Sequence, residues 1–223
     1  MKEIRVRAAR SKARALDGYQ HLLYLPHGYR NERKADKYPL VLFLHGAGER
    51  GSNLKLVKVH GVPRRIASGA EFPFIALAPQ CPSGEVWDPG RLEALVDATI
   101  GAYNVDTNRI YVTGISMGGA GTWALANRCP DRLAAIVPIC GPRLFIPAER
   151  LCNLPIWVFH GAMDNAVPID DSVRMVRGIR EAGGNVKFTV YADSDHDSWT
   201  ETYNNAVVYD WLLSKALKKP RRV

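Results

Sequence analysis

Short hydrophobic runs alternate with polar, glycine-rich segments along the whole chain. Two of the runs, residues 39–44 and 156–159, contain only apolar side chains, which is typical of strands buried on both faces of a parallel sheet. Residues 186–191 alternate instead, as expected of a strand at the edge of a sheet. Further strands are predicted over residues 19–25, 74–78, 110–113 and 133–139.

Apolar positions at helical spacing lie between these strands, most clearly over residues 92–103. Strands and helices alternate, and no linker or internal repeat divides them. The sequence therefore predicts one α/β domain over residues 1–223, with an open, mostly parallel sheet and helices on both faces. Other helices are predicted over residues 52–70, with an interruption at 61–63, and over residues 118–128, 169–182 and 203–217.

A glycine-flanked serine follows the strand predicted at residues 110–113. Residues 114–118 have the pattern G-x-S-x-G with Ser116 at the centre. Between a strand and a helix, this pattern holds a nucleophilic serine on a tight turn, and bulkier residues at Gly114 and Gly118 would collide with adjacent chain. The free N–H groups of the following helix would face developing negative charge. The alternative is a plain glycine-rich turn with a capping serine.

An acid and a histidine come later, each in a loop after a predicted strand. Asp164 is placed to accept a hydrogen bond from an imidazole, although an Asx-turn or a helix N-cap would also explain it. His196 is the one histidine that follows Asp164 in the chain. Serine, acid and histidine occur in the order expected for a nucleophile on such a turn. Asp193 and Asp195 are alternative acid partners for His196.

The glycine-rich segment 45–51 follows the first fully apolar strand, and its backbone can approach a ligand closely. We expect backbone N–H groups of Ala47, with Gly48 as the fallback, and of Met117 to form an oxyanion hole. A plain turn between strand and helix is the alternative. His45 is expected to brace the segment rather than to titrate in catalysis.

Five stretches together resemble the α/β-hydrolase-fold serine esterases. They occur in the same order in compact carboxylesterases of the phospholipase/carboxylesterase-like or "predicted peptidase" type, near feruloyl and acetylxylan esterases. The resemblance implies an α/β-hydrolase fold and a Ser116–His196–Asp164 catalytic triad. The stretches are residues 43–51, 78–82, 114–119, 157–164 and 196–199.

The same resemblance implies hydrolysis of short-chain or aryl carboxylic esters through an acyl-enzyme, with no metal or organic cofactor. Feruloyl and acetylxylan esters are the candidate natural substrates. The triad alone does not select the reaction. Acyl transfer, thioester hydrolysis and peptide hydrolysis stay open, as does a binding module without catalysis.

Many hydrolases of this type carry a helical lid near residues 141–153, where this chain has room for little more than a loop. The site is therefore expected to be open to water and to accept small-molecule or polysaccharide-linked esters. Trp87 and Trp199 are candidate substrate-binding residues that could stack on a flat acyl or sugar group. Surface packing is the alternative for Trp87.

The net charge of +8 changes this picture little. Residues 1–14 and 215–223 each carry +5, so the rest of the chain carries −2. Basic ends on a nearly neutral body are usually solvated tails, and nucleic acid is not expected as a partner. No apolar run reaches the ~18 residues of a membrane span. We see no signal peptide, which leaves the cytoplasm or secretion after signal removal as alternatives, and the oligomeric state is not predicted.

The four cysteines lack the C-x-x-C spacing of zinc sites. We expect them to be buried free thiols, with one disulfide as the alternative. They are Cys81, Cys129, Cys140 and Cys152.

Overall fold

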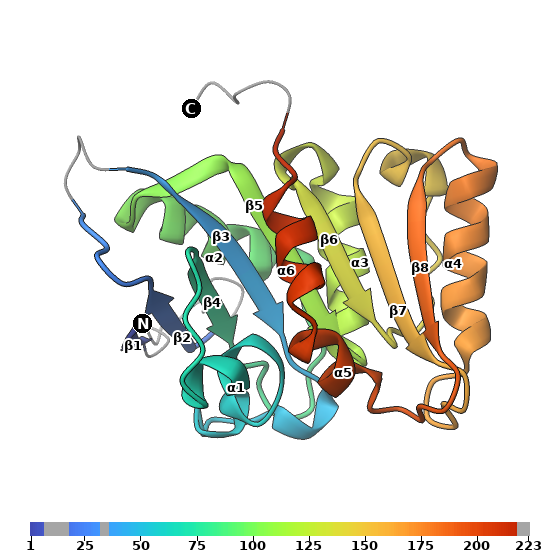
Figure 1. Cartoon of the computed structure of the whole chain (residues 1–223), viewed down its shortest axis with the longest axis horizontal. Helices are drawn as coiled ribbons and strands as arrows, with labels where there is room; N and C mark the ends of the chain where they lie inside the picture. Colours follow the sequence, from blue (N-terminus) through green and yellow to red (C-terminus); the bar gives the residue numbers. More distant parts are fainter. Residues whose placement is uncertain (7–17, 32–35, 218–223) are drawn as a thin grey trace.

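Eight strands form one sheet at the centre of the protein, seen in a computed structural model that describes residues 1–6, 18–31 and 36–217 (Figure 1). The strand order is β1-β2-β4-β3-β5-β6-β7-β8. β2 is antiparallel to both of its neighbours, and all the other pairs are parallel. The strands are β1 Lys2–Val6, β2 His21–Leu25, β3 Tyr38–Leu44, β4 Ile75–Pro79, β5 Val105–Ile115, β6 Ala135–Ile139, β7 Ile156–Gly161 and β8 Val186–Tyr191.

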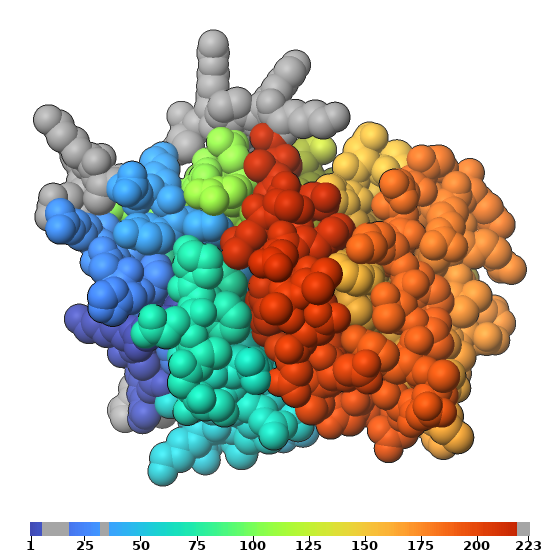
Figure 2. All heavy atoms as spheres, viewed as in Figure 1, coloured from blue at the N-terminus to red at the C-terminus, as the bar shows by residue number. Residues whose placement is uncertain are grey.

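Helices cover both faces of this sheet. Buried side chains of α2, α3 and α4 belong to the hydrophobic cluster on one face, and those of α1, α5 and α6 to the cluster on the other. The C-terminal helices fill the surface between the α1 segment and the β7–β8 side of the sheet (Figure 2). The expected α/β-hydrolase architecture is confirmed. The helices are α1 Gly61–Ala67, α2 Pro89–Ala102, α3 Met117–Arg128, α4 Ile169–Glu181, α5 Ser198–Asn204 and α6 Ala206–Leu213.

The apolar run of β3 shows why central strands need no polar face. Leu40, Leu42 and Leu44 contribute to the first cluster, whereas Val41 and Phe43 contribute to the second. Successive side chains of a strand point to opposite faces. Both faces are covered by helices here, so every position of the strand after Tyr38 is buried.

The N-terminal end differs from the prediction of a solvated tail. Lys2–Val6 form β1, an edge strand that pairs antiparallel with β2. This strand contains only two apolar positions of the kind that burial requires, Ile4 and Val6, so its signal is weak in the sequence. Residues 7–14 lie outside the described residues. At the other end, the Leu217 N–H donates to the Asn108 carbonyl, so residues 215–217 also pack on the body.

Two predicted helices are shorter than expected. The region 52–70 contains a 3₁₀ turn, Leu56–Lys58, and becomes α-helical only from Gly61, where an interruption was expected. The predicted C-terminal helix is divided between α5 and α6 at Asn205, whose extended backbone ends one helix while its side chain caps the next by accepting from the Val207 N–H. A single capping asparagine can divide a helix without changing the spacing of the hydrophobic residues, so that spacing alone does not predict the break.

Within the described residues, no lid helix covers the carboxyl ends of the strands. The segment between β6 and β7 holds one short 3₁₀ turn, Ala148–Leu151, and otherwise irregular backbone. Its Phe145 side chain is 89% exposed. The expectation of an open fold without a substantial lid is confirmed.

Gly61 joins α1 to the sheet. Its φ is +62°, and a Cβ there would lie 2.1 Å from the Phe43 ring. Gly69 also has a positive φ, +93°, but nothing lies within 4 Å of its Cβ position. The two glycines therefore separate backbone strain from crowding.

We predict that Gly61→Ala destabilises the protein by about 1–3 kcal/mol more than Gly69→Ala does, because only the first substitution adds a clash with a buried ring. Urea unfolding of the two variants and the wild type measures this difference. Equal losses of unfolding free energy would show that the contact with Phe43 is not tight.

Candidate active site

Loops at the carboxyl ends of three strands meet at one place. Ser116 follows β5, Asp164 lies beyond β7, and His196 lies beyond β8. These strands are parallel and lie in the same half of the sheet, so their carboxyl ends lie along one edge of it. The three side chains that the sequence singles out are thus brought together.

Ser116 lies on a strained turn. Its φ and ψ are 52° and −119°, immediately before α3 begins at Met117. Its N–H donates to the Ile139 carbonyl at the end of β6. Residues other than glycine rarely adopt such backbone angles, which persist only where the surrounding structure enforces them.

The two glycines of the pentapeptide enforce this turn. A Cβ on Gly118 would lie 2.0 Å from the Leu44 carbonyl oxygen, and one on Gly114 would lie 2.3 Å from the Gly118 oxygen. Both obstacles are backbone atoms, which cannot move aside as a side chain can. The predicted collision at both positions is therefore present in the structure.

His196 connects the serine to the acid. Its Nε2 lies 2.9 Å from Ser116 Oγ, and its Nδ1 lies 2.7 Å from Asp164 Oδ2. Since a carboxylate only accepts hydrogen bonds, Nδ1 carries the proton, and Nε2 is left with the lone pair that can accept from the serine hydroxyl. The imidazole is 27% exposed and the Asp164 side chain is fully buried.

Asp164 is held as a carboxylate. Burial raises the pKa of its carboxyl, but hydrogen bonds from His196 and from the Val167 and Ala166 N–H groups outweigh burial and keep the pKa below its ordinary value. Both N–H groups donate to Oδ1, whereas Oδ2 faces the His196 imidazole and also lies 3.2 Å from Nε2 of the buried His160. Asp195 instead accepts from the Asp197 N–H within its own turn. The geometry thus favours Asp164 over this alternative acid.

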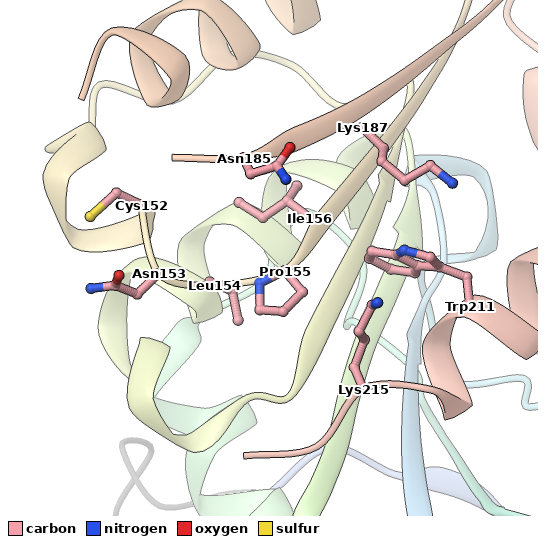
Figure 3. A pocket seen from close by; sticks show the side chains of 9 residues that line it. All are labelled: Cys152, Asn153, Leu154, Pro155, Ile156, Asn185, Lys187, Trp211 and Lys215. Carbon is pink, nitrogen blue, oxygen red and sulfur yellow. The ribbon is translucent and has the colours of Figure 1, made fainter. Parts of the chain in front are cut away.

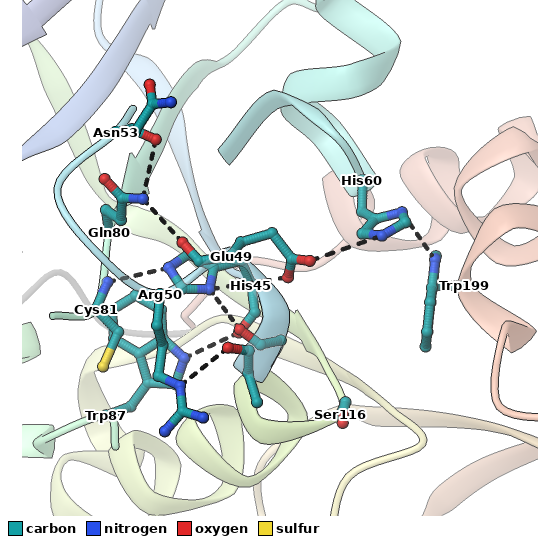
Figure 4. A network of polar contacts seen from close by, with 12 residues as sticks. His45, Glu49, Arg50, Asn53, His60, Gln80, Cys81, Trp87, Ser116 and Trp199 are labelled. Carbon is teal, nitrogen blue, oxygen red and sulfur yellow. Dashed lines mark hydrogen bonds and ion pairs between the residues drawn. The ribbon is translucent and has the colours of Figure 1, made fainter. Parts of the chain in front are cut away.

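The loop after β3 is braced by His45, as expected (Figure 4). The Cys81 N–H donates to its Nε2, so its Nδ1 carries the proton and donates to the Gly46 carbonyl. Burial lowers the pKa of the His45 imidazole to about 4. This histidine therefore stays neutral near pH 7 and holds the loop in place.

The two proposed oxyanion donors come from different segments. Ala47 belongs to the loop after β3, and Met117 directly follows Ser116. Ala47 begins a 3₁₀ turn, Ala47–Glu49, and is exposed. Its carbonyl accepts a hydrogen bond from Arg50 Nε. Met117 is the first residue of α3, where a backbone N–H has no acceptor within the helix. Their roles remain a proposal.

Trp87 does not lie at the mouth of the site. It is 4% exposed, and its indole N–H donates to the His45 carbonyl. Its ring packs against Gly121 of α3, where a Cβ would lie 2.8 Å away. The prediction of a pocket wall is therefore wrong, because α3 and the His45 loop enclose this ring.

Trp199 does lie beside the imidazole. Its ring meets the His196 ring edge to face, with centroids 5.2 Å apart. Its indole N–H donates to His60 Nδ1, and His60 in turn faces Glu49 (Figure 4). His60 and Glu49 are not predicted as site residues from the sequence, since neither belongs to a pattern that indicates chemistry.

Cys140 is not predicted as a site residue either. It follows β6 and shares with Ser116 a positive φ, 40°, which no other non-glycine residue described here adopts. Its sulfur lies within 4.8 Å of the nearby carboxylate and imidazole atoms of Asp164 and His196. Burial raises the pKa of its thiol to about 12, so the thiol is neutral beside the triad. None of the four cysteines forms a disulfide, as expected, although Cys129 and Cys152 are only half-buried.

A separate cavity of about 370 Å³ lies at the amino ends of β7 and β8, away from the triad (Figure 3). It is lined by the segment before β7, the start of β8 and the side chains of Trp211 and Lys215. The triad lies at the carboxyl ends of β5, β7 and β8, so this cavity is not part of the candidate site. No helix in the described part of the chain is long and apolar enough to cross a bilayer.

The family is decided by the central and C-terminal parts of the chain. Residues 82–212, which contain Ser116, Asp164 and His196, match the dienelactone hydrolase family. The chain belongs to this family.

Relatives and solved structures of similar sequence carry esterase names. The chain is 26% identical to the bifunctional acetylxylan esterase/xylanase XynS20E of Neocallimastix patriciarum, over 83% of this chain and 27% of that protein. It is 28% identical to "Probable feruloyl esterase C" of Aspergillus terreus, over 76% of this chain and 63% of that protein. The crystal structure of a thermostable esterase superposes with a TM-score of 0.79 at 32% identity, over 94% of this chain and 62% of that one.

These comparisons confirm the serine-esterase resemblance at the level of family and fold. The chain spans less than two thirds of the length of each of these three proteins. What each of them acts on is therefore a guide to a proposal for this member of the dienelactone hydrolase family.

Asp164 predicts a pH dependence of stability. The pKa of its carboxyl is lower in the folded protein. Its interactions therefore stabilise the fold above the ordinary carboxyl pKa of about 3.9, and this stabilisation is lost as the pH falls through the lower folded value. We expect Asp164→Asn to destabilise the protein most near pH 7, and the difference from wild type to shrink below about pH 4.

Urea unfolding at several pH values measures this difference. Asp195→Asn is the matched control, since this exposed carboxylate serves only a local turn, and it should cost less at every pH. A loss in Asp164→Asn that does not change with pH would contradict the assigned charge.

Proposed function

We propose that this protein is a serine carboxylesterase in which Ser116 is the nucleophile, His196 the general base and acid, and Asp164 the residue that orients the imidazole. The observation that carries the proposal is the continuous hydrogen-bond chain from Ser116 Oγ through His196 to Asp164. The strained turn that presents the serine supports it. A serine that only capped a helix would need neither feature.

In the first half of the reaction, Ser116 Oγ attacks the ester carbonyl carbon and its proton passes to His196 Nε2. Asp164 holds the imidazole in the required tautomer and stabilises the imidazolium that forms. His196 then gives the proton to the leaving alcohol oxygen as the carbon–oxygen bond breaks. The acyl group stays on the serine.

Charge on the carbonyl oxygen is greatest between these two bond changes. The N–H groups of Met117 and Ala47 are the proposed donors to this oxyanion, each worth roughly 3 kcal/mol in the transition state. The N-terminus of α3 adds the favourable end of its dipole below Ser116. Water then repeats the cycle on the acyl-enzyme and releases the acid, so the chemistry needs no metal or organic cofactor.

The openness of the site supports hydrolysis and a small acyl group. No lid from the described part of the chain covers the strand ends, and the His196 imidazole is partly exposed, so water reaches the acyl-enzyme directly. An open site cannot enclose a long acyl chain, and each CH₂ left unburied forgoes about 0.8 kcal/mol. Trp199 is the proposed contact for a flat acyl or sugar group.

The natural substrates that we propose are hydroxycinnamoyl or acetyl esters, either free or linked to a polysaccharide. The names of the acetylxylan and feruloyl esterase relatives support this choice.

We predict that Ser116→Ala abolishes ester hydrolysis while leaving the fold intact, because it removes the nucleophile alone. Asp164→Asn should lower kcat by about 10⁴, the loss known for the equivalent change in a serine protease. Steady-state kinetics on a short p-nitrophenyl ester, with circular dichroism as a check of folding, test both. Asp193→Asn and Asp195→Asn are the controls and should change kcat far less. A Ser116→Ala variant that kept more than a few per cent of turnover would overturn the assignment.

We predict the highest kcat/KM on acyl chains of two to about six carbons, since longer chains gain nothing in an open site. A panel of p-nitrophenyl esters of rising length, together with methyl hydroxycinnamates, measures this profile. Emulsified triglyceride is the comparison for interfacial activity. A maximum at twelve carbons or more, or a jump in rate above substrate saturation, would contradict the open site.

A further inference from the structure

Glu49, His60 and Trp199 form a row of side chains beside the loop after β3 (Figure 4). The row ends at the imidazole of His196. Glu49 Oε1 lies 3.8 Å from His60 Nε2, and His60 Nδ1 accepts a hydrogen bond of 3.2 Å from Trp199 Nε1. The Trp199 ring then meets the His196 ring edge to face. None of these contacts is needed for the chemistry described above.

The hydrogen bond from Trp199 selects the tautomer of the neutral His60 ring. An indole N–H only donates, so Nδ1 of His60 must carry a lone pair. The proton of the neutral ring is therefore on Nε2, on the side of the Glu49 carboxylate. The lone pair on Nδ1 thus faces the indole N–H of Trp199, and the N–H on Nε2 faces the carboxylate of Glu49. Contacts on both sides therefore orient the ring.

Both ends of the row lie next to the proposed catalytic machinery. Glu49 closes the same 3₁₀ turn that begins at Ala47. Its carboxylate and Ser116 both border Gly46: a Cβ built there would lie 3.3 Å from Glu49 Oε2 and 3.7 Å from Ser116 Cβ. The side chain of Glu49 is only 12% exposed, and Oε2 has no hydrogen-bond partner among the described residues.

The middle of the row is anchored to the core. His60 is the residue before α1, and Gly61 packs directly on the buried Phe43 ring. The Glu49 carbonyl accepts from Gln80 Nε2. His60 and Glu49 are therefore both attached to segments that pack on the sheet, whereas His196 lies in a loop after its last strand.

We propose that His60, oriented by Glu49, is a positioning residue that holds Trp199 against His196 and thereby keeps the imidazole aligned between Ser116 and Asp164. This inference rests on the proposed esterase function. The row links the loop of the oxyanion donor Ala47 to the loop of the general base. Without the row, the imidazole can move away from the geometry that proton transfer requires. A displacement of about 1 Å lowers the rate of reaction far more than it weakens substrate binding.

The test compares His60→Ala with His60→Asn. The Asn Oδ1 occupies nearly the place of Nδ1 and can still accept from Trp199, whereas alanine cannot. We expect His60→Ala to lower kcat on the order of tenfold with KM little changed, Trp199→Phe to lower kcat similarly, and His60→Asn to recover most of the loss in His60→Ala. Val59→Ala, an exposed neighbour outside the row, should match wild type. Equal kcat in His60→Ala and wild type, or equal losses in His60→Ala and His60→Asn, would overturn the inference.

A second measurement does not depend on turnover. The His196 Nδ1 proton, which lies in the short contact with Asp164, should give a low-field proton NMR signal that is absent from Asp164→Asn. We expect this signal to broaden or vanish in His60→Ala and to persist in His60→Asn. An unchanged signal in His60→Ala would refute the positioning role even if the wild type hydrolysed no ester. Failure of the proposed function would instead appear as a wild type that shows the signal, and its dependence on His60, without turnover.

Discussion

The backbone contact between Gly118 and Leu44 is the constraint on which the candidate site depends. At the start of α3, the chain approaches the end of β3 so closely that a Cβ on Gly118 would lie 2.0 Å from the Leu44 oxygen. This approach places the serine turn beside the loop that carries Ala47. It also turns the N-terminus of α3 toward the reacting position. The positive φ of Ser116 follows from the same crowding, so the strain is the consequence of bringing two strands and a helix to one point.

Charge and exposure are distributed unequally around this point. Asp164 is buried and satisfied by two backbone N–H groups and an imidazole, whereas Ser116 and His196 are only partly buried. The acid is therefore fixed, and the reacting groups remain accessible to substrate and water. The absence of a lid in the described residues extends this arrangement to the whole site. This arrangement supports the proposal that the substrates are small esters rather than esters of a long acyl chain.

Much of this could be predicted from the sequence because the signals were periodic or stereochemical. The fully apolar runs of β3 and β7 identify central strands, and Gly114 and Gly118 mark a turn that tolerates no side chain. Tertiary context decided the rest. Trp87 ends a loop, which favours exposure, yet α3 has a glycine at position 121 that admits its ring. β1 is an edge strand that is stabilised by pairing with β2, and its own sequence does not predict a strand. Glu49 and His60 come from separate loops, so only the fold shows that they meet Trp199.

The most direct measurement of the central claim is covalent labelling by a fluorophosphonate, which reacts with a serine that an adjacent base activates. Intact mass and peptide mapping count the adducts and locate them. The proposed mechanism predicts one adduct per chain, on Ser116, formed quickly in the wild type and slowly when His196 is replaced by alanine. The absence of an adduct, or an adduct on another residue, would contradict the assignment of Ser116 as the activated nucleophile.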